Sequence, residues 1–336
     1  MKVAILSPIV WRTPPRRYGP WEQVASNVAE GLLNKGIDVT LFATGDSITQ
    51  GKLAYTSEQP YGENTAIDAK VAECLHISNL FERAGEFDII HNHYDFLPLT
   101  YSRLTGTPMI TTIHGFSSPL IVPVYQKYNA TNHYVSISNA NRHADLHYAA
   151  TVYNGVDPCD FNFVDQPEDY LLYFGRIHPE KGAREAIAVA KNCGKKIVLA
   201  GLIQETGYFN TYILPAIDDK TVIYVGNCGP AERNRLLGSA LALLHLISFE
   251  EPFGLSVAEA MFCGTPVIAF NRGAMRELIS HGRTGYLVQT LTDAETAVHQ
   301  IATIRRKECR QWAIDNFSKG KMADEYFQLY ELILNR

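Results

Sequence analysis

Short runs of β-branched and other apolar residues alternate with longer helical patterns along the whole chain. Val3–Ser7 is the first such run, and residues 22–34 then repeat apolar side chains at helical spacing before Gly36. Further strands are predicted at Asp38–Ala43, Asp88–His91 and Met109–Ile113. An alternation of this kind predicts parallel sheets covered by helices, which is an α/β fold.

A second series of alternating elements begins near residue 170. Its predicted strands are Leu171–Phe174, Ile197–Ala200, Val222–Val225, Ala242–Leu246 and Val267–Phe270. Helices are predicted to begin near Glu180, Pro230 and Leu255, and a last helix spans Cys309–Leu334. The segment Asn154–Pro167 carries Gly, Pro and Asp with little periodicity, and 336 residues suit two domains. We therefore predict doubly wound, Rossmann-like domains at 1–160 and 161–310 that face each other across a cleft, with 311–336 as a helix crossing back to the first.

The composition is that of a folded, soluble protein, and it gives no reason to expect a nucleic acid as partner. The chain is 46% hydrophobic and 19% charged, with a formal net charge of -5. No concentrated basic face is evident, so nucleic-acid binding is not expected. Leu241–Ile247 is too short to span a bilayer, and Val3–Leu6 is too short for a signal peptide. The expected location is therefore the cytoplasm.

Two glutamates are separated by seven residues in the segment from Ser248 to Ile268. Glu251 follows a predicted strand, and Glu259 lies within a predicted helix at Leu255–Phe262 whose free N-terminal amides can bind an anion. Gly254 between them allows the backbone to approach a ligand. Two carboxylates at this separation can accept hydrogen bonds from hydroxyls at opposite ends of an elongated ligand. The alternative is a favourable charge before a helix and a glutamate on a solvated face.

Two cations follow another strand, in the segment YFGRIHPEKG from Tyr173 to Gly182. Arg176 and Lys181 are five residues apart, so a turn must bring them together. A guanidinium and an ammonium then suit a diphosphate. The alternative is an inert surface lysine and an arginine paired with a nearby carboxylate. Neither G-x-G-x-x-G nor G-x-x-x-x-G-K-[ST] occurs, which removes the usual support for a dinucleotide or P-loop site.

The run EPFGLSVAEAMFCGTPVIA, which begins at Glu251, resembles the E-x7-E region of glycosyltransferase family 4. This family comprises retaining enzymes of the GT-B fold, and the likeness covers nearly the whole chain. It implies that Glu251 contacts hydroxyls of the donor sugar and that Glu259 contacts the ribose. It also implies that backbone amides around Phe253, Gly254 and Leu255 hold the sugar and the phosphate.

The family's G-R-x-x-x-x-K-G motif matches Gly175, Arg176 and Lys181. The resemblance implies that both cations bind the donor pyrophosphate. It places the base near Asn227, in the loop Gly226–Cys228, although these residues do not identify the base. Members of this fold need no D-x-D metal motif, and the sequence has none. We therefore expect a UDP- or GDP-sugar as substrate, with no metal and no cofactor.

The segment PPRRYGPWEQ resembles the family's glycine-rich acceptor loop and the start of the helix that follows it. Gly19 and Glu22 match the acceptor-side positions. Pro20 replaces the usual second glycine and removes its amide. His114, in TTIHGFSS, follows a predicted strand, and the resemblance implies that it contacts the donor sugar near the reacting carbon. Without the resemblance, a packed or capping histidine is the commoner interpretation.

His91, His93 and Asp95 follow another strand, in DIIHNHYDF. The H-x-H spacing suggests a metal, but two imidazoles without a clear third protein ligand make a poor zinc site. The family often has histidine and aspartate here on the acceptor side, which makes His93 and Asp95 candidates for contacting the acceptor.

The resemblance implies a retaining hexosyltransferase that moves a sugar from an NDP-sugar to a hydroxyl acceptor in glycan, glycolipid or natural-product biosynthesis. Its expected catalytic residues are His114, Arg176, Lys181 and Glu251. The acceptor is a saccharide, a lipid-linked sugar or a small molecule, and a lipid-linked acceptor would bring the enzyme to the inner face of the membrane. The alternatives are a GT-B nucleotide-sugar epimerase or hydrolase, and a non-catalytic nucleotide-sugar-binding protein.

Overall fold

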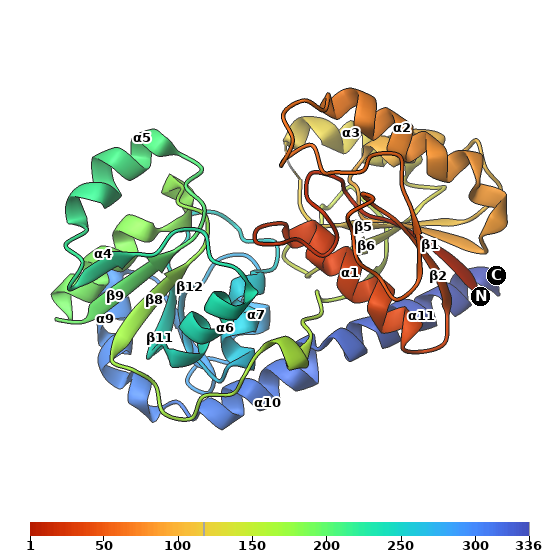
Figure 1. Cartoon of the computed structure of the whole chain (residues 1–336). Helices are drawn as coiled ribbons and strands as arrows, with labels where there is room; N and C mark the ends of the chain where they lie inside the picture. The colour runs from red at the N-terminus through yellow and green to blue at the C-terminus, as the bar shows by residue number, and fades with distance from the viewer. Residues whose placement is uncertain (117, 336) are drawn as a thin grey trace. The chain divides into compact units, whose positions relative to one another are not determined.

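The computed structural model describes residues 1–116 and 118–335, and the chain forms two compact units (Figure 1). The N-terminal unit comprises Met1–Gly155 and Lys319–Arg336, and the C-terminal unit comprises Val156–Ser318. Each unit is built on a parallel sheet with helices, so the expected α/β architecture of two Rossmann-like domains is confirmed.

The sheet of the N-terminal unit is parallel, in the order β3-β2-β1-β4-β5-β6-β7. Its strands are β1 (Lys2–Leu6), β2 (Asp38–Phe42), β3 (Lys52–Ala54), β4 (Ile89–Asn92), β5 (Met109–Ile113), β6 (His133–Ser136) and β7 (Tyr148–Thr151). The first strand lies inside the sheet, and the strand order reverses between β1 and β4. The loops that follow these two strands therefore diverge, which is where sheets of this type bind ligands.

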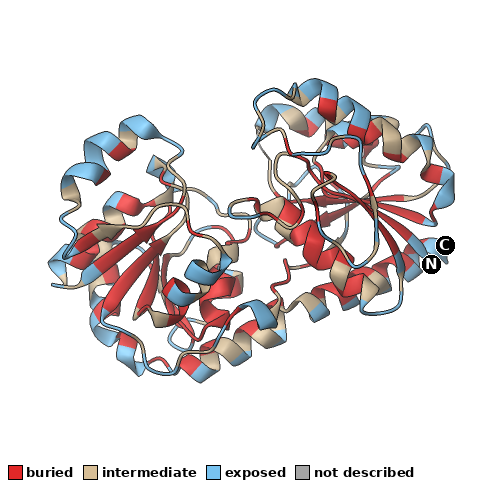
Figure 2. Cartoon of the chain, viewed as in Figure 1, coloured by how far each residue is buried: buried red, intermediate tan, exposed pale blue. Residues whose placement is uncertain are grey.

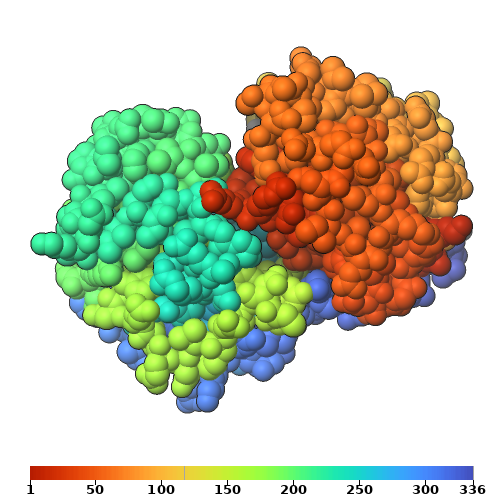
Figure 3. Space-filling model, in the orientation of Figure 1, coloured from red at the N-terminus to blue at the C-terminus, as the bar shows by residue number. Residues whose placement is uncertain are grey.

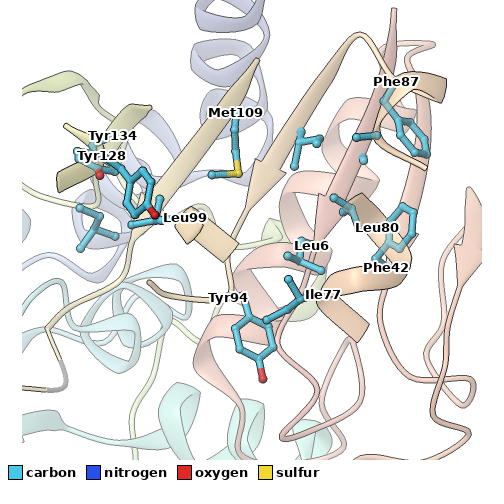
Figure 4. Close-up of a cluster of buried hydrophobic side chains, with 14 of the residues drawn as sticks. Leu6, Phe42, Ile77, Leu80, Phe87, Tyr94, Leu99, Met109, Tyr128 and Tyr134 are labelled. Carbon is cyan, nitrogen blue, oxygen red and sulfur yellow. The ribbon is translucent and has the colours of Figure 1, made fainter. Parts of the chain in front are cut away.

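Helices cover both faces of this sheet. On one face, α2 (Ala69–Glu82) and α3 (Val122–Tyr128) close a hydrophobic cluster that includes Leu6, Ile77 and Tyr128 (Figure 4). On the other face lie α1 (Pro20–Leu33) and α11 (Lys319–Leu334), which pack against each other. Gly31 permits this contact, since a Cβ there would stand 2.7 Å from the Cβ of Ala323. The last helix of the chain is thus part of the N-terminal unit.

The sheet of the C-terminal unit is also parallel, in the order β10-β9-β8-β11-β12-β13. Its strands are β8 (Tyr170–Phe174), β9 (Lys196–Ala200), β10 (Val222–Tyr224), β11 (Ala242–His245), β12 (Val267–Phe270) and β13 (Gly285–Val288). Its helices are α4 (Ala183–Asn192), α5 (Thr206–Tyr208), α6 (Pro230–Ser239), α7 (Leu255–Phe262), α8 (Met275–Leu278), α9 (Leu291–Gln300) and α10 (Arg306–Phe317). The order reverses between β8 and β11, as it does between β1 and β4.

Burial follows this layering in both units. The central strands are buried, while the outward sides of the helices are exposed (Figure 2). In the space-filling view, the green and turquoise segment from α5 to α6 forms much of the visible surface of the C-terminal unit (Figure 3). Within the described part of the chain, every helix falls short of the length and apolar character that a bilayer span requires.

The structure differs from the sequence-based expectations mainly at the C-terminus. The single helix expected over Cys309–Leu334 is two helices, because Ser318 adopts an extended conformation (φ -75°, ψ 149°). The first of them, α10, belongs to the C-terminal unit, so the chain returns to the N-terminal unit at Lys319 and not at residue 311. The other crossing lies at Gly155, where residue 160 was expected. Four strands were not predicted: β3, β6, β7 and β13.

Candidate functional site

Lys181 and Glu251 meet where the strand order of the C-terminal sheet reverses. Lys181 lies in the turn after β8, and Glu251 lies in the loop after β11. The Lys181 ammonium donates to the Glu251 Oε2 atom at 2.6 Å, and the two side chains retain only 16% and 12% of their exposure. The pair is therefore a largely desolvated ion pair at the position where doubly wound sheets bind ligands.

His245, the last residue of β11, also approaches this carboxylate. Its Nε2 atom lies 3.6 Å from Glu251 Oε2, and the residue is buried. Burial alone would raise the pKa of Glu251, but His245 and Lys181 outweigh burial and hold that pKa at about 2. His245 is not among the residues predicted from the sequence. The available signal was a histidine at the end of an otherwise apolar strand.

Glycines allow the backbone around this ion pair to pack closely. Gly182 has φ +76°, and a Cβ there would stand 2.0 Å from the carbonyl oxygen of Leu246. Gly273 has φ +53°, and a Cβ there would stand 2.3 Å from the backbone nitrogen and oxygen of Glu251. The amide of Ala274 then donates to the Glu251 carbonyl oxygen at 2.9 Å. These contacts hold the Glu251 backbone in one position.

The segment between Glu251 and α7 contains a glycine in a left-handed backbone conformation. Gly254 adopts φ +96° and directly precedes Leu255, the first residue of α7. Phe253 is 2% exposed, and its ring packs edge-on against Phe317. Its side chain thus packs in the core of the unit.

Glu259 forms a second ion pair within the same unit. Its Oε1 atom lies 3.2 Å from the Arg233 guanidinium, which also stacks over the ring of Phe161 at 5.1 Å. Glu259 is 7% exposed, so the alternative of a glutamate on a solvated face is wrong. Burial raises the pKa of Glu259, and Arg233 only partly opposes this. Nothing in the sequence distinguished Arg233 from other helical arginines.

The structure does not bring Arg176 and Lys181 onto a common partner. Arg176 hydrogen-bonds to the side-chain oxygen of Gln204, and within residues 1–116 and 118–335 it forms no ion pair with a carboxylate, contrary to the alternative prediction. Gly175 lies beside Gly201, where a Cβ would stand 1.8 Å from the Gly175 oxygen. The Gly201 amide in turn donates to the Gly226 oxygen at 2.8 Å, next to Asn227. The loops after β8, β9 and β10 are therefore joined through their backbones.

In the N-terminal unit, Glu22 lies in the first turn of α1 and is 3% exposed. Burial raises its pKa to about 7, although it accepts a hydrogen bond from the Trp11 amide at 3.2 Å. A Cβ at Gly19 would stand 2.7 Å from the Cβ of Pro15 and 3.1 Å from a carboxylate oxygen of Glu22. Pro20 is the first residue of α1, where the missing amide would have had no partner within the helix.

His93 and His114 lie at the carboxyl ends of the adjacent strands β4 and β5. His93 Nδ1 is 3.0 Å from His114 Nε2, and the Trp21 ring stacks on the His114 ring with 5.4 Å between their centroids. His114 is 7% exposed and His93 is fully buried, so His93 reaches a ligand only through His114. Among residues 1–116 and 118–335, no group of three His, Cys, Asp or Glu residues is placed to hold a metal.

Asp95 follows β4 and has an unusual backbone conformation. Its φ is +113°, a region that costs a non-glycine residue of the order of 1–3 kcal/mol and that is found mainly at functional sites. Its Oδ1 atom accepts from the Tyr125 hydroxyl at 2.5 Å, and its carbonyl accepts from the Asn92 side chain at 2.9 Å. Burial raises the pKa of Asp95 to about 6. These contacts hold the strained residue at the ligand-binding edge of the sheet.

Two family models match consecutive segments of the chain. The model described as Glycosyltransferase Family 4 matches residues 21–159, and the model described as Glycosyl transferases group 1 matches residues 160–317. Together they cover most of both units.

Relatives of known activity and solved structures are similar over most of the chain. The D-inositol 3-phosphate glycosyltransferase of Pseudarthrobacter chlorophenolicus is 25% identical over 351 residues, covering 85% of this chain and 83% of that protein. The GDP-mannose:cellobiosyl-diphosphopolyprenol alpha-mannosyltransferase of Komagataeibacter xylinus is 26% identical over 294 residues, covering 75% and 73%. The crystal structure of AviGT4, a glycosyltransferase involved in avilamycin A biosynthesis, has a TM-score of 0.74 at 26% identity and covers 100% and 98%. This chain therefore belongs to glycosyltransferase family 4 and is a glycosyltransferase.

Proposed function

We propose that this enzyme transfers a sugar from a nucleoside-diphosphate sugar to a hydroxyl acceptor, with retention of configuration at the anomeric carbon. The observation that carries the proposal is the buried ion pair of Lys181 and Glu251, which stands at the strand-order reversal of the C-terminal sheet. A cation for phosphate and a carboxylate for sugar hydroxyls lie together there, which is the chemistry that a nucleotide-sugar requires.

The ion pair gives each partner a role in donor binding. A diphosphate attracts the Lys181 ammonium away from Glu251, whose carboxylate then accepts from the sugar hydroxyls. Arg176 adds a second charge for the diphosphate, and the backbone of Gly175, Phe253, Gly254 and Leu255 contributes to the same ligand. Glu259 holds the ribose, and Asn227 lies beside the base. The two side-chain cations supply the positive charge for the leaving group, so we propose a transfer that needs no metal.

The proposed chemistry is a substitution on one face of the sugar. The bond between the anomeric carbon and the diphosphate oxygen breaks, and the acceptor oxygen bonds to the same face of that carbon. The acceptor proton passes to an oxygen of the leaving diphosphate. Lys181 and Arg176 stabilise the charge that develops there, which is the largest expected contribution to the rate. His114, Gly19, Glu22 and Asp95 contribute to sugar and acceptor binding from the N-terminal unit.

The names of two similar proteins support two classes of donor in this proposal. The Komagataeibacter xylinus relative is named for GDP-mannose, and the Anabaena protein HepE, with a TM-score of 0.76 at 18% identity over 99% of this chain, was crystallised with UDP and glucose. We therefore propose a UDP- or GDP-hexose as the donor. A saccharide, a lipid-linked sugar or a small molecule is the acceptor in a biosynthetic reaction, and the enzyme acts in the cytoplasm or at the inner face of the membrane.

A donor panel tests the proposal. The purified enzyme is incubated with UDP- and GDP-hexoses, with and without a panel of hydroxyl acceptors and with and without EDTA. We expect a glycosylated product whose anomeric configuration, measured by NMR, equals that of the donor, and the same rate in EDTA. Isomerised or hydrolysed donor as the main product without acceptor would instead support an epimerase or hydrolase. Nucleotide binding without any turnover would support a binding protein.

The variant Arg176→Ala tests the diphosphate assignment directly. We expect its kcat to fall by roughly 10²–10³-fold, because a preorganised charge at the leaving group is lost. Arg184→Ala is the matched control, because Arg184 lies at the start of α4 and stacks on Tyr212. Wild-type turnover by Arg176→Ala would show that Arg176 does not contact the diphosphate.

A further inference from the structure

We propose that His93 is a positioning residue that fixes the proton of His114 on Nδ1 and so makes His114 a hydrogen-bond donor to a substrate hydroxyl oxygen. The inference rests on the proposed function only for the identity of the substrate. It starts from the contact between His93 Nδ1 and His114 Nε2 at 3.0 Å, in which both rings are buried. Two neutral imidazoles can share such a bond in only two ways, and the two ways give His114 opposite chemistry.

Both imidazoles are neutral in the folded protein. Burial lowers the pKa of His114 to about 3 and lowers the pKa of His93 well below its usual value. One nitrogen of each ring therefore carries a proton and the other carries a lone pair. The hydrogen bond between the rings uses the proton of one ring and the lone pair of the other. The surroundings of the second nitrogen of His93 therefore show which ring is the donor.

That second nitrogen, His93 Nε2, is buried without a hydrogen-bond partner. If His114 Nε2 donated to His93 Nδ1, then His93 Nε2 would carry an orphaned buried N–H. If His93 Nδ1 donates, then Nε2 carries only an unused lone pair. Orphaned buried donors are rarer in proteins than acceptors with unused lone pairs. The geometry therefore favours donation from His93 to His114, which leaves the His114 proton on Nδ1.

The surroundings hold both rings in this arrangement. His93 is on the same face of β4 as His91, and their ring centroids are 4.1 Å apart. His91 cannot take part in the exchange, because its Nδ1 bonds the Tyr330 hydroxyl at 2.6 Å and its Nε2 bonds the Thr112 hydroxyl at 2.7 Å. The His93 amide donates to the Leu6 oxygen at 2.9 Å, which anchors its backbone.

His114 Nδ1 is the nitrogen left for a ligand. Its ring stacks on Trp21 with an interplanar angle of 21° and tilts by 32° against His93, so two ring contacts and one hydrogen bond fix its position. Among the described residues, no side chain or backbone group hydrogen-bonds to Nδ1, and His114 keeps 7% of its surface exposed. A substrate oxygen is the partner that an N–H in this position requires.

The ¹⁵N NMR spectrum of the histidines tests the protonation directly. We expect His114, assigned with the variant His114→Asn, to show a protonated Nδ1 and an unprotonated Nε2 in the enzyme without substrate. In His93→Leu, which removes the donor, we expect the two tautomers of His114 to become mixed. His93→Asn places an amide donor near the position of Nδ1 and is expected to restore the wild-type pattern.

Kinetics test what the proton does. We expect kcat of His93→Leu to fall about tenfold or more, because one oriented hydrogen bond is lost, with KM for the donor changed less than threefold and recovery in His93→Asn. His76→Leu is the matched control, since His76 is also buried in this unit but bonds the backbone oxygen of Ser7. Thermal unfolding of each variant identifies any that fails to fold.

A protonated Nε2 on His114 in the wild type would overturn the inference, as would a His93→Leu enzyme with wild-type kcat and unchanged His114 signals. If the enzyme transferred no sugar to any acceptor, the proposed function would be wrong. The ¹⁵N spectrum would still test the tautomer of His114. The two failures are therefore distinguishable.

Discussion

Lys181 and Glu251 form an ion pair, with 2.6 Å between Nζ and Oε2, that joins the loops after β8 and β11. The strand order of the C-terminal sheet reverses between these two strands. His245 approaches the same carboxylate oxygen at 3.6 Å. In the free enzyme, Lys181 and Glu251 therefore satisfy each other. A donor that binds both groups must first separate them, so the site is held together before its ligand arrives.

Replacement of Lys181 by Met should affect both activity and stability. We expect kcat to fall by roughly 10²–10³-fold, since charge stabilisation of the leaving diphosphate is lost. We also expect the free energy of unfolding to fall by about 3 kcal/mol, because Glu251 keeps its burial but loses its main cation. Enzyme assays and urea unfolding measure the two effects.

The control for Lys181 is Lys195→Met. Lys195 also pairs at 2.6 Å, with Asp169, but that carboxylate is 74% exposed. An exposed pair contributes about 0–1 kcal/mol, so this variant should unfold near the wild-type midpoint and keep its activity. Equal behaviour of the two variants would contradict the role given to Lys181.

The stability of the enzyme should depend on Glu251 in acid. The folded-state pKa of Glu251 is about 2, below its ordinary value of 4.5, so its ionised form stabilises the fold above pH 4.5. This contribution, on the order of 3 kcal/mol, should disappear as the pH falls from 4.5 towards 2. Urea unfolding between pH 6 and pH 3 should show a smaller loss of stability for Glu251→Gln than for the wild type. Parallel curves for the two proteins would exclude a depressed pKa.

Glu22 should have the opposite effect on stability. Its pKa is raised from 4.5 to about 7 by burial, so the fold is favoured when Glu22 is protonated and loses stability as the pH rises from 4.5 through 7. We expect Glu22→Gln to be more stable than the wild type at pH 8, by on the order of 3 kcal/mol, and similar to it at pH 4. Urea unfolding at the two pH values measures the difference, and Glu58→Gln, at an exposed position, is the control. A raised KM for the acceptor in Glu22→Gln would support the proposed role of Glu22 in acceptor binding.

Tyr330→Phe should destabilise the N-terminal unit. The Tyr330 hydroxyl bonds His91 Nδ1 at 2.6 Å, and both residues are fully buried. Its removal leaves a buried nitrogen without a partner, which costs about 1–3 kcal/mol. The urea midpoint should therefore fall, whereas Tyr55→Phe, at a residue that is 46% exposed, should leave it nearly unchanged. No change in Tyr330→Phe would mean that His91 is satisfied in another way.

The sequence predicts best the positions of the apolar strands. Met109–Ile113 and Val267–Phe270 match β5 and β12, because each is a short run of mostly apolar or β-branched residues. All residues of these two strands except Phe270 are buried. The strand β7 was missed because Tyr148–Thr151 is partly exposed and contains two alanines, which are depleted in strands. The break at Ser318 was missed because helical spacing continues on both sides of it without a proline.

In the candidate site, too, the sequence predicts residues that local position identifies and misses contacts between residues that are distant along the chain. Lys181 and Glu251 were identified from their positions after strands and from family resemblance, and the structure places them in contact. The partnership of His93 with His114 depends on which strands are neighbours and in what register, and local spacing carries no such information. Arg233 was missed for the same reason, since its pairing with Glu259 joins two helices that the sequence does not relate.

The return of the chain to the N-terminal unit at Lys319 has a consequence for biosynthesis. The C-terminal unit is one continuous insertion, and its two ends are neighbours, because the Val156 amide donates to the Phe317 oxygen at 2.8 Å. All of its strands leave the ribosome before α11 does. The N-terminal unit, by contrast, lacks the helix that packs on α1 and the Tyr330 hydroxyl that bonds His91 until α11 has been made. The N-terminal unit is therefore completed after the C-terminal unit, and a nascent chain that stops short of α11 carries a finished C-terminal unit and an N-terminal sheet that has α1 on one face without its partner helix.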